Sequence, residues 1–478
     1  MKISELLKYL EYKSFYGDAE TQITGLCADS EKISEGDLFF CYKGKDHDSH
    51  DFARDAEKRG AVALVCERKL DCPLPQIIVN SGRGSIATAA RAFFGFADKK
   101  LKLIGVTGTN GKTTTTFMLE SIFKAAGKSV GVIGTLGISY AEKFVSPELT
   151  TPDPIFLHSI FADMVNCGVG YVFMEVSAHA LYFNKIEGLH YEVGIFTNCT
   201  QDHLDFFGNM HDYAESKKLM FREGRCGYAV VNTDDALGRE LLSGVKNAVG
   251  YGLKNPADVF AVDVREKIDG SDFVINLFDE LYDIHLNVPA LHNVYNAMGA
   301  AACAKILKIE TDDIAKGLKN LKTVAGRLEH VAKYNGADIF VDFAHTPDGL
   351  EKSLQSLKKF CRGKLYCLFG CGGNRDKSKR PIMGEIVAKY ADLCIVTSDN
   401  PRYEDPYDII SDIEAGIKPT GRRYVTVTER ETATEYAINL LEKDDILLVA
   451  GKGGEYYQEI MGIKHSYNDN AVIKKIIG

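Results

Sequence analysis

The stretch Gly108–Thr114, which reads Gly-Thr-Asn-Gly-Lys-Thr-Thr, has the residue types that bind nucleotide phosphates. Glycines let backbone N–H groups approach phosphate oxygens, and the start of a following helix adds a favourable dipole. We expect Lys112 on the β- and γ-phosphates and the hydroxyl of Thr113 on Mg²⁺. The pattern G-x-x-x-x-G-K-[ST] is incomplete, because Val106 takes the first glycine position. A glycine-rich turn that binds nothing is the alternative, and the lysine and threonines disfavour it.

Polar side chains also follow two apolar runs that have the composition of buried strands. Glu175 lies near the end of the run 171–177, and Asp202-His203-Leu204-Asp205 follows the run 193–198. In a parallel sheet the carboxyl ends of the strands face the ligand crevice. Glu175 is therefore placed as a magnesium ligand would be. Lys217 and Lys218 lie in the helical stretch 210–221, where paired lysines taken alone usually indicate a solvated helix face.

Two further stretches have helix-start residues. Thr150-Thr151-Pro152-Asp153 predicts a helix entry with a hydroxyl cap and an early proline. Asn293 and Asn296 open the alanine-rich helix predicted at 292–302, where an asparagine either caps the helix or contacts a base edge.

The C-terminal part of the chain has four apolar runs that each lead into a polar or glycine-rich loop. The runs are 337–343, 365–369, 393–397 and 445–450. This pattern predicts a doubly wound α/β domain with its ligand face at the loops. The Gly-Cys-Gly-Gly turn after the second run lacks a complete G-x-G-x-x-G pattern, which disfavours NAD.

These elements belong to a chain of 478 residues, for which about three domains are expected. The net charge of −9 argues against nucleic acid as a main partner. No apolar run approaches the length of a membrane span, and the N-terminus lacks the apolar core of a signal peptide. The twelve cysteines include no Cys-x-x-Cys pair, so we expect free thiols in a reducing cytoplasm.

In their order along the chain, these motifs resemble those of the Mur ligase family, and the resemblance covers essentially the whole sequence. The markers are Thr107–Thr114, Thr150–Asp153, Met174–Ser177, Asp202–Asp205, Asn293–Asn296, Gly326-Arg327, Asp342–Pro347 and Asp399–Arg402. The resemblance implies an α/β, three-domain architecture with a central P-loop ATPase domain built on a parallel sheet and a Rossmann-like C-terminal domain. The expected domains are 1–98 for the UDP-substrate, 99–323 for ATP and 324–478 for the amino acid.

Within the family, the chain most resembles ligases that add the third peptide residue in peptidoglycan precursor synthesis. The implied substrate is UDP-N-acetylmuramoyl-L-alanyl-D-glutamate, whose D-glutamate γ-carboxyl would be activated by ATP as an acyl phosphate and then joined to an amine. The resemblance further implies a monomer in the cytoplasm that neither binds nucleic acid nor inserts into a membrane.

The family positions also imply roles for single residues around ATP and two Mg²⁺ ions. Lys217 matches a lysine that condenses with CO₂ to a carbamate, an anionic oxygen ligand that suits Mg²⁺. Glu175 and His203 would share the second Mg²⁺ with it, and Thr113 would bind the first. The predicted catalytic residues are Lys112, Glu175, His203, Lys217 and Arg327. The predicted nucleotide-binding residues are Gly108, Thr109, Asn110, Gly111, Lys112, Thr113, Thr114, Asn293, Asn296, Arg327, Asp342 and His345.

The motif Asp399-Asn400-Pro401-Arg402 resembles that of family members that add meso-2,6-diaminopimelate. This amino acid carries a distal carboxylate, which an arginine fork binds with two hydrogen bonds. The predicted substrate-binding residues are Ser30, Thr150, Thr151, Ser177, Lys185, Arg375, Asp399, Asn400, Arg402, Gly451 and Glu455. For Arg402 the alternative is a loop salt bridge. Three alternative functions stay open: an L-lysine-adding ligase, a folylpolyglutamate synthase-like ligase, and a nucleotide-binding switch without ligase activity.

Overall fold

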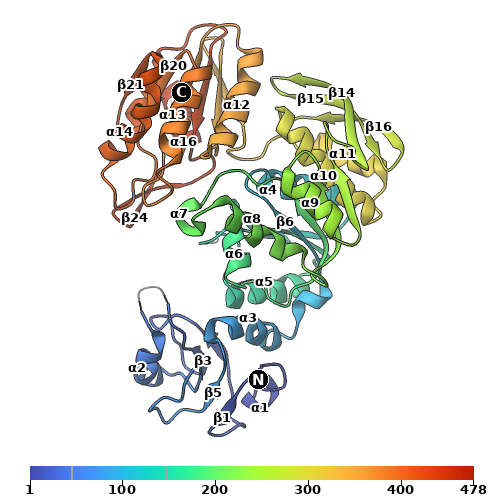
Figure 1. Cartoon of the computed structure of the whole chain (residues 1–478), viewed down its shortest axis with the longest axis vertical. Helices are drawn as coiled ribbons and strands as arrows, with labels where there is room; N and C mark the ends of the chain where they lie inside the picture. The colour runs from blue at the N-terminus through green and yellow to red at the C-terminus, as the bar shows by residue number, and fades with distance from the viewer. Residues whose placement is uncertain (45–46, 147) are drawn as a thin grey trace. The chain divides into compact units, whose positions relative to one another are not determined.

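The computed structural model describes residues 1–44, 47–146 and 148–478 (Figure 1). The chain folds into two compact units that each combine several segments. The first unit comprises Met1–Gly105, Ser129–Glu192 and Arg222–Gly227, and the second comprises Val106–Lys128, Val193–Phe221 and Tyr228–Gly478. These units do not follow the predicted boundaries at 98/99 and 323/324, which stay predictions.

The N-terminal part of the first unit is a five-stranded sheet with helices on both faces. Its strands lie in the order β1-β5-β4-β3-β2, and all neighbours are parallel except β1 and β5. The elements are α1 (Ile3–Leu6), β1 (Ser14–Tyr16), β2 (Gly25–Cys27), β3 (Asp37–Phe40), α2 (Ala53–Lys58), β4 (Ala63–Cys66), β5 (Gln76–Ile78) and α3 (Gly82–Phe93). Leu38 and Phe40 pack with α1 and α3, whereas Phe39 packs with α2, because successive strand side chains point to opposite faces.

The rest of the first unit contains the strands and helices around Glu175. They are β7 (Val130–Gly134), β8 (Gly137–Tyr140), β9 (Lys143–Val145), α5 (Pro154–Asn166), β10 (Tyr171–Glu175) and α6 (Ala178–Tyr182). Strands β10 and β7 are parallel, and β8 and β9 continue as an antiparallel meander. The predicted hydroxyl cap of the helix after Thr151 is wrong. Helix α5 begins at Pro154 after Asp153, and the Thr151 hydroxyl donates instead to the Glu175 carbonyl at 2.8 Å.

The second unit begins with the phosphate loop between β6 and α4. Its elements up to residue 320 are the end of β6 (Lys102–Thr107), α4 (Lys112–Ala125), β11 (Tyr191–Phe196), α7 (Leu204–Phe207), α8 (Met210–Lys218), β12 (Cys226–Asn232), α9 (Ala236–Gly244), β13 (Ala248–Tyr251), β14 (Val259–Lys267), β15 (Gly270–Leu277), β16 (Glu280–Leu286), α10 (Leu291–Ile306) and α11 (Thr311–Asn320). Strands β12 to β14 are parallel, and β14, β15 and β16 are antiparallel neighbours. Helices α10 and α11 pack against α4.

The C-terminal part of the second unit is the predicted doubly wound domain. A six-stranded sheet has the order β17-β18-β22-β19-β20-β21, parallel except for the β17–β18 pair. Its strands are β17 (Glu329–Tyr334), β18 (Ala337–Asp342), β19 (Leu365–Phe369), β20 (Leu393–Val396), β21 (Tyr424–Thr426) and β22 (Ile446–Ala450). A separate hairpin, β23 (Tyr457–Ile460) and β24 (Ile463–Ser466), follows β22.

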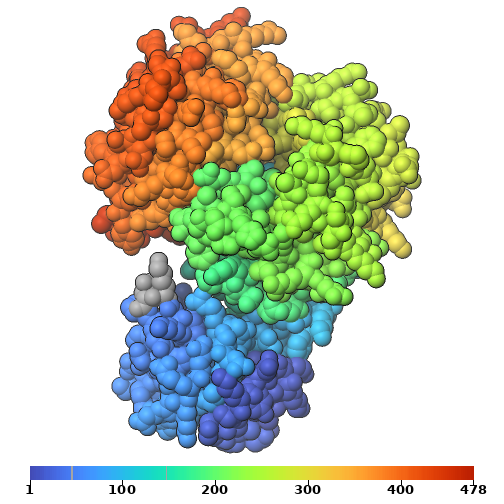
Figure 2. All heavy atoms as spheres, viewed as in Figure 1, coloured from blue at the N-terminus to red at the C-terminus, as the bar shows by residue number. Residues whose placement is uncertain are grey.

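Helices cover both faces of this sheet. Helices α12 (Pro347–Phe360), α13 (Lys379–Tyr390) and α14 (Pro406–Ile417) pack on the face that carries Phe340 and Leu448. Helices α15 (Arg430–Asn439) and α16 (Asp469–Ile477) pack on the face that carries Ile339 and Leu447. Burial on both faces explains why these strands appear in the sequence as continuous apolar runs. The region is coloured orange to red in Figure 2. No helix among the described residues is long and apolar enough to cross a membrane.

Candidate active site

The phosphate loop joins β6 to α4 and depends on two glycines. Gly108 has φ +148° and Gly111 has φ +90°, values that side-chain-bearing residues rarely adopt. A Cβ atom on Gly108 would meet the Thr197 hydroxyl at 1.9 Å, so the close approach also requires glycine. The Lys112 ammonium donates to the carbonyls of Gly108 and Thr109 at 2.8 and 2.9 Å. The lysine thus lies folded along the loop, within reach of any phosphate that the loop binds.

The segment after β11 holds this loop in place. The Thr197 hydroxyl donates to the Asn110 carbonyl at 2.6 Å, and the Asn198 side chain accepts the Asn110 N–H at 2.9 Å. The Thr109 hydroxyl lies within hydrogen-bond distance of the Thr200 carbonyl, at 3.1 Å. These bracing residues were not among those predicted from the sequence, although they immediately precede the Asp-His-Leu-Asp motif.

Residues from the C-terminal sheet region reach the phosphate loop. Arg327 donates from Nη2 to the Thr113 hydroxyl at 3.0 Å, and its guanidinium stacks on the Phe343 ring at 4.3 Å. Asn110 donates from its side chain to the Asp348 carboxylate at 3.0 Å. The predicted neighbours Thr113 and Arg327 therefore lie together, and Asp348 is a contact that the sequence analysis missed.

Asn293 and Asn296 lie on α10, and neither caps that helix. Helix α10 begins at Leu291 after Ala290, and Asn293 donates back to the Pro289 carbonyl at 2.6 Å. Asn296 donates to the Asn293 side-chain oxygen at 3.0 Å. The Asn296 side-chain oxygen would lie only 2.4 Å from a Cβ atom on Gly111, so glycine is required there. The asparagine pair is therefore packed against the phosphate loop.

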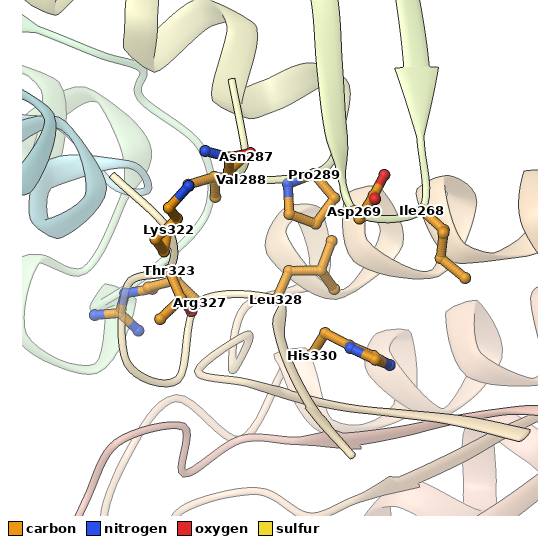
Figure 3. A pocket seen from close by; sticks show the side chains of 10 residues that line it. All are labelled: Ile268, Asp269, Asn287, Val288, Pro289, Lys322, Thr323, Arg327, Leu328 and His330. Carbon is orange, nitrogen blue, oxygen red and sulfur yellow. The ribbon is translucent and has the colours of Figure 1, made fainter. Parts of the chain in front are cut away.

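A cavity of about 300 Å³ adjoins Arg327 (Figure 3). It is lined by Ile268, Asp269, Asn287, Val288, Pro289, Lys322, Thr323, Arg327, Leu328 and His330. Six of these ten residues are polar or charged and four are apolar, so the lining is more polar than that of most small-molecule sites. Of the predicted nucleotide-binding residues, only Arg327 lines this cavity.

Asp342 closes the turn after β18. Its carboxylate accepts the N–H groups of Leu328 and Ala344, each at 2.6 Å. Burial raises the pKa of Asp342 to about 6, although Arg327 and the two N–H groups favour the charged form. The carboxylate thus fixes the segment that carries Arg327, a structural role that the prediction of nucleotide contact did not include.

Asp202 is a buried anion between three basic side chains. Lys379, His203 and His345 lie 3.4, 3.3 and 3.8 Å from its carboxylate oxygens. Burial alone would raise the pKa of Asp202, but the attraction of Lys379 and the two histidines holds it well below its ordinary value. His345 is further fixed by the Phe343 carbonyl at 2.7 Å, so the structure brings the predicted residues His203 and His345 to one carboxylate.

Lys217 is buried inside the second unit, so its interpretation as part of a solvated helix face is wrong. The side chain is 1% exposed, and Nζ lies 4.0 Å from the centroid of the Tyr213 ring. Burial lowers the pKa of Lys217 to about 8, against the attraction of Cys199, Asp202 and Asp235. Its neighbour Lys218 instead makes surface ion pairs with glutamates. Among the described residues, no group of three or more His, Cys, Asp and Glu side chains is arranged to hold a metal.

In the first unit, Glu175 lies at the end of β10 as predicted and is 1% exposed. Its carboxylate accepts the Thr135 N–H at 2.9 Å and the Thr135 hydroxyl at 3.1 Å. Thr150 lies 3.1 Å from the Thr135 hydroxyl, and the Thr151 hydroxyl accepts the Ser177 N–H at 3.0 Å. Three predicted substrate-binding residues are therefore linked to Glu175, Thr150 through Thr135, and Thr151 and Ser177 through the Glu175 backbone carbonyl.

Two other predicted substrate residues lie elsewhere in the first unit. Lys185 forms an ion pair with Asp153 at 2.6 Å. Ser30 is half-buried in the turn after β2, where Asp29 caps the Glu31 N–H at 3.0 Å. No helix follows Ser30 directly in the chain.

The predicted amino-acid pocket is assembled at the carboxyl ends of three adjacent strands, β19, β20 and β22. Arg402 donates from Nη1 to the Gly373 carbonyl at 2.8 Å and pairs through Nε with Glu459 at 3.1 Å. Burial and the like charge of Arg402 lower the pKa of Arg375. Two close guanidinium groups favour an anionic ligand.

The other side of this pocket is acidic and tightly built. Asn400 donates to the Glu455 carboxylate at 3.0 Å, and Asp399 lies 2.6 Å from where a Cβ on Gly451 would be. Gly451 has φ +111°, so a side chain there is excluded by both conformation and space. All six predicted pocket residues therefore belong to neighbouring loops. The salt bridge that was the alternative for Arg402 is present, and its role in binding an amino acid stays a prediction.

Family models match most of the chain. The "Mur ligase family, catalytic domain" model matches residues 22–93, the "Mur ligase middle domain" model matches 106–304, and the "Mur ligase, glutamate ligase domain" model matches 326–453.

Named relatives match over the full length. UDP-N-acetylmuramoyl-L-alanyl-D-glutamate--2,6-diaminopimelate ligase 1 of Clostridium acetobutylicum is 40% identical over 479 residues, covering 99% of this chain and 98% of the relative. The corresponding ligase of Geobacillus thermodenitrificans is 39% identical, with coverage of 100% and 99%. A solved structure of a ligase with that name superposes with a TM-score of 0.70 at 27% identity, covering 100% of this chain and 98% of that one. The motifs, the fold and these matches agree, and the chain belongs to the Mur ligase family.

Proposed function

We propose that the protein is an ATP-dependent ligase that joins meso-2,6-diaminopimelate to the D-glutamate γ-carboxyl of UDP-N-acetylmuramoyl-L-alanyl-D-glutamate. The observation that carries this proposal is the full-length similarity, near 40% identity, to relatives named for that reaction. The placement of Arg375, Arg402 and Glu455 on loops at the carboxyl ends of adjacent strands supports the choice of amino acid. Such a product is a cytoplasmic precursor of peptidoglycan, and we expect the enzyme to act there as a monomer.

ATP would bind with its phosphates on the loop Gly108–Thr114. Lys112 would exchange its two loop carbonyls for phosphate oxygens, because both kinds of group accept hydrogen bonds from an ammonium. Arg327 would contact the γ-phosphate from the opposite side, and its stacking on Phe343 limits the motion of the guanidinium.

The chemistry would follow in two steps. The γ-carboxylate of the D-glutamate residue attacks the γ-phosphorus of ATP, ADP leaves, and an acyl phosphate forms. The amine of diaminopimelate then attacks the acyl carbon, phosphate leaves, and the ammonium proton passes to solvent. Lys112 and Arg327 would stabilise the charge on the transferred phosphoryl oxygens, an effect that is strong where donors are fixed in advance.

The hydroxyl of Thr113, the carboxylate of Glu175 and a carbamate on Lys217 would offer the oxygen ligands that Mg²⁺ prefers, and His203 would add a nitrogen. Thr113 would hold one ion, and Glu175, His203 and carbamylated Lys217 would hold the second. Bound Mg²⁺ supplies neutralisation of phosphate charge during transfer. Carbamate formation requires a neutral amine, and the full burial and lowered pKa of Lys217 support it. The role of CO₂ and the presence of two metal sites rest on the family resemblance together with this observation.

The UDP-linked dipeptide would lie on first-unit residues. The hydroxyls of Thr150, Thr151 and Ser177 and the ammonium of Lys185 are donors that suit the carboxylates and carbonyls of a peptide. Ser30 would lie at the uridine end. An exchange of the Lys185–Asp153 ion pair for a substrate carboxylate would keep the lysine charge paired.

An amino-acid panel tests the proposal. The purified protein is mixed with ATP, Mg²⁺ and the UDP-dipeptide, and phosphate release is measured with meso-diaminopimelate, L-lysine, or no amino acid. We expect release that depends on diaminopimelate, with a product heavier by one diaminopimelate residue. Equal turnover with L-lysine would favour the lysine-adding alternative, and turnover only with a folate acceptor and glutamate would favour the folylpolyglutamate synthase-like one. ATP binding without release in any mixture would indicate a regulatory switch.

A further inference from the structure

Lys452 is a lysine with no exposed surface at the start of the loop after β22. A buried ammonium is costly unless it is paired and hydrogen-bonded. Among the described residues its partners are two predicted pocket residues. Nζ donates to the Asn400 side-chain oxygen at 2.9 Å and to Glu455 Oε2 at 2.9 Å.

Lys452, Asn400 and Glu455 form a closed triangle of hydrogen bonds. The Asn400 side-chain nitrogen also donates to Glu455 Oε2, at 3.0 Å, and the Glu459 N–H donates to the Asn400 oxygen at 2.9 Å. The orientation of the Asn400 amide is therefore determined, because its oxygen faces two donors and its nitrogen faces a carboxylate. Reversal of the amide would bring like groups together at both ends.

The triangle also fixes Glu455. Both side-chain bonds arrive at Oε2, and within the described part of the chain Oε1 receives none. Glu455 is 21% exposed, whereas Lys452 is fully covered. The carboxylate is thus held by one oxygen from inside the protein, and its other oxygen is available to a ligand ammonium.

We infer that Lys452 is a positioning residue for the amino-acid substrate, which acts by holding Glu455 and Asn400 in the geometry that receives the distal ammonium of a diamino acid. The inference rests on the proposed function. Without the lysine ammonium, the Asn400 oxygen loses one of its two donors, and Glu455 Oε2 loses its only charged partner among the described residues.

Neighbouring charges support this assignment. Burial alone would raise the pKa of Asp399, but the charges of Lys452 and Arg430 hold it below its ordinary value. Lys452 therefore acts on two carboxylates of the same pocket, through a hydrogen bond to Glu455 and through its charge on Asp399.

The test compares KM values for meso-diaminopimelate and for ATP in single and double variants. Lys452→Met removes the ammonium and keeps the side-chain length. Lys464→Met is the matched control, because this exposed lysine lies over the same Tyr457 ring, at 4.6 Å against 5.7 Å for Lys452. Glu455→Gln, alone and combined with Lys452→Met, shows whether the lysine acts through the glutamate.

We expect Lys452→Met to raise the KM for diaminopimelate at least tenfold and to leave the KM for ATP within twofold. Lys464→Met should change neither by more than twofold. In the Glu455→Gln background, Lys452→Met should have less than a threefold further effect. An unchanged KM for diaminopimelate, an equal rise in both KM values, or effects that multiply in the double variant would overturn the inference.

Two controls keep the outcome interpretable. The wild type is assayed first, and a lack of response to diaminopimelate there contradicts the proposed function rather than the role of Lys452. If Lys452→Met does not fold, Lys452→Gln is measured in the same way, since it keeps a neutral donor. If neither variant folds, Lys452 stabilises the fold rather than the pocket, and the inference is overturned.

Discussion

Replacement of Arg402 by lysine tests the proposed recognition of the distal carboxylate. Arg402 uses Nε for Glu459 and one Nη1 hydrogen for Gly373, so the remaining Nη1 hydrogen and Nη2 can meet a carboxylate side by side. Lysine keeps the positive charge but presents a single point of contact. Residue 402 has φ +55°, and because both side chains have a Cβ, the substitution adds no backbone strain.

The expected loss follows from these contacts. Of two charge-assisted hydrogen bonds to the substrate carboxylate, one is removed, and such a bond contributes about 1.5–3 kcal/mol. This corresponds to a fall in kcat/KM for diaminopimelate of roughly 10- to 150-fold. L-Lysine lacks the distal carboxylate, so kcat/KM for L-lysine should change less than threefold. The ratio of kcat/KM for diaminopimelate to that for L-lysine should therefore fall by nearly the whole loss seen with diaminopimelate.

Phosphate release is measured at varied diaminopimelate with ATP and the UDP-dipeptide saturating. Arg362→Lys, an exposed arginine in the same sheet region, is the matched control and should behave as wild type. Thermal melting checks that the Arg402 variant is folded. A kcat/KM for diaminopimelate within twofold of wild type would refute the assignment of Arg402, as would an equal loss with both amino acids.

Three further predictions concern buried ionisable groups. Lys217→Ala should lower kcat at least a thousandfold, because it removes a proposed metal ligand. Added formate or acetate should restore part of the phosphate release by filling the place of the carbamate. Unchanged activity would contradict the carbamate role. Arg430→Met leaves Asp469 buried without its charged partner and the two hydrogen bonds from it, of 2.9 and 2.8 Å, so urea unfolding should show a loss of about 3–5 kcal/mol. His158 is buried with no partner on either ring nitrogen among the described residues, and burial lowers its pKa to about 4 from 6.5. The unfolded chain therefore binds the proton more tightly between these values, and stability falls as the pH drops from 6.5 towards 4. His158→Phe should reduce this fall in Tm, and an identical pH profile would contradict the cause.

The sequence predicted best the elements that are buried on both faces. The run 365–369 coincides with β19, and 337–343 exceeds β18 by a single residue, because a strand covered on both sides must be apolar throughout. The phosphate loop was equally clear, since its glycines, lysine and threonines are needed together. Strands β1, β2 and β5 have only three residues each and carry too little periodicity to be recognised.

The partners of the site residues were harder to predict, because they come from distant segments. The burial of Lys217 depends on packing around α8, and its own helix contains no signal that separates it from Lys218. Asp202 meets Lys379 across 177 positions of sequence. Asp342 accepts the N–H group of Ala344 in its own turn and that of Leu328, 14 positions earlier, and no sequence pattern indicated the second contact. Lys452 lies in the loop Gly-Lys-Gly-Gly-Glu, of which only Gly451 and Glu455 were predicted to bind substrate.

The contacts of Arg327 and Asp348 with the phosphate loop bear on how this enzyme can be recombined with its relatives. Both residues precede or begin α12, whereas Arg375, Arg402 and Glu455 follow it. The division between phosphate chemistry and amino-acid choice therefore lies within one α/β fold, across a single helix, and not at a linker between domains. A chimera joined within α12 would take its amino-acid preference from the relative and retain Arg327 and Asp348 of this chain. A junction before residue 324 would replace these two residues and the amino-acid pocket together.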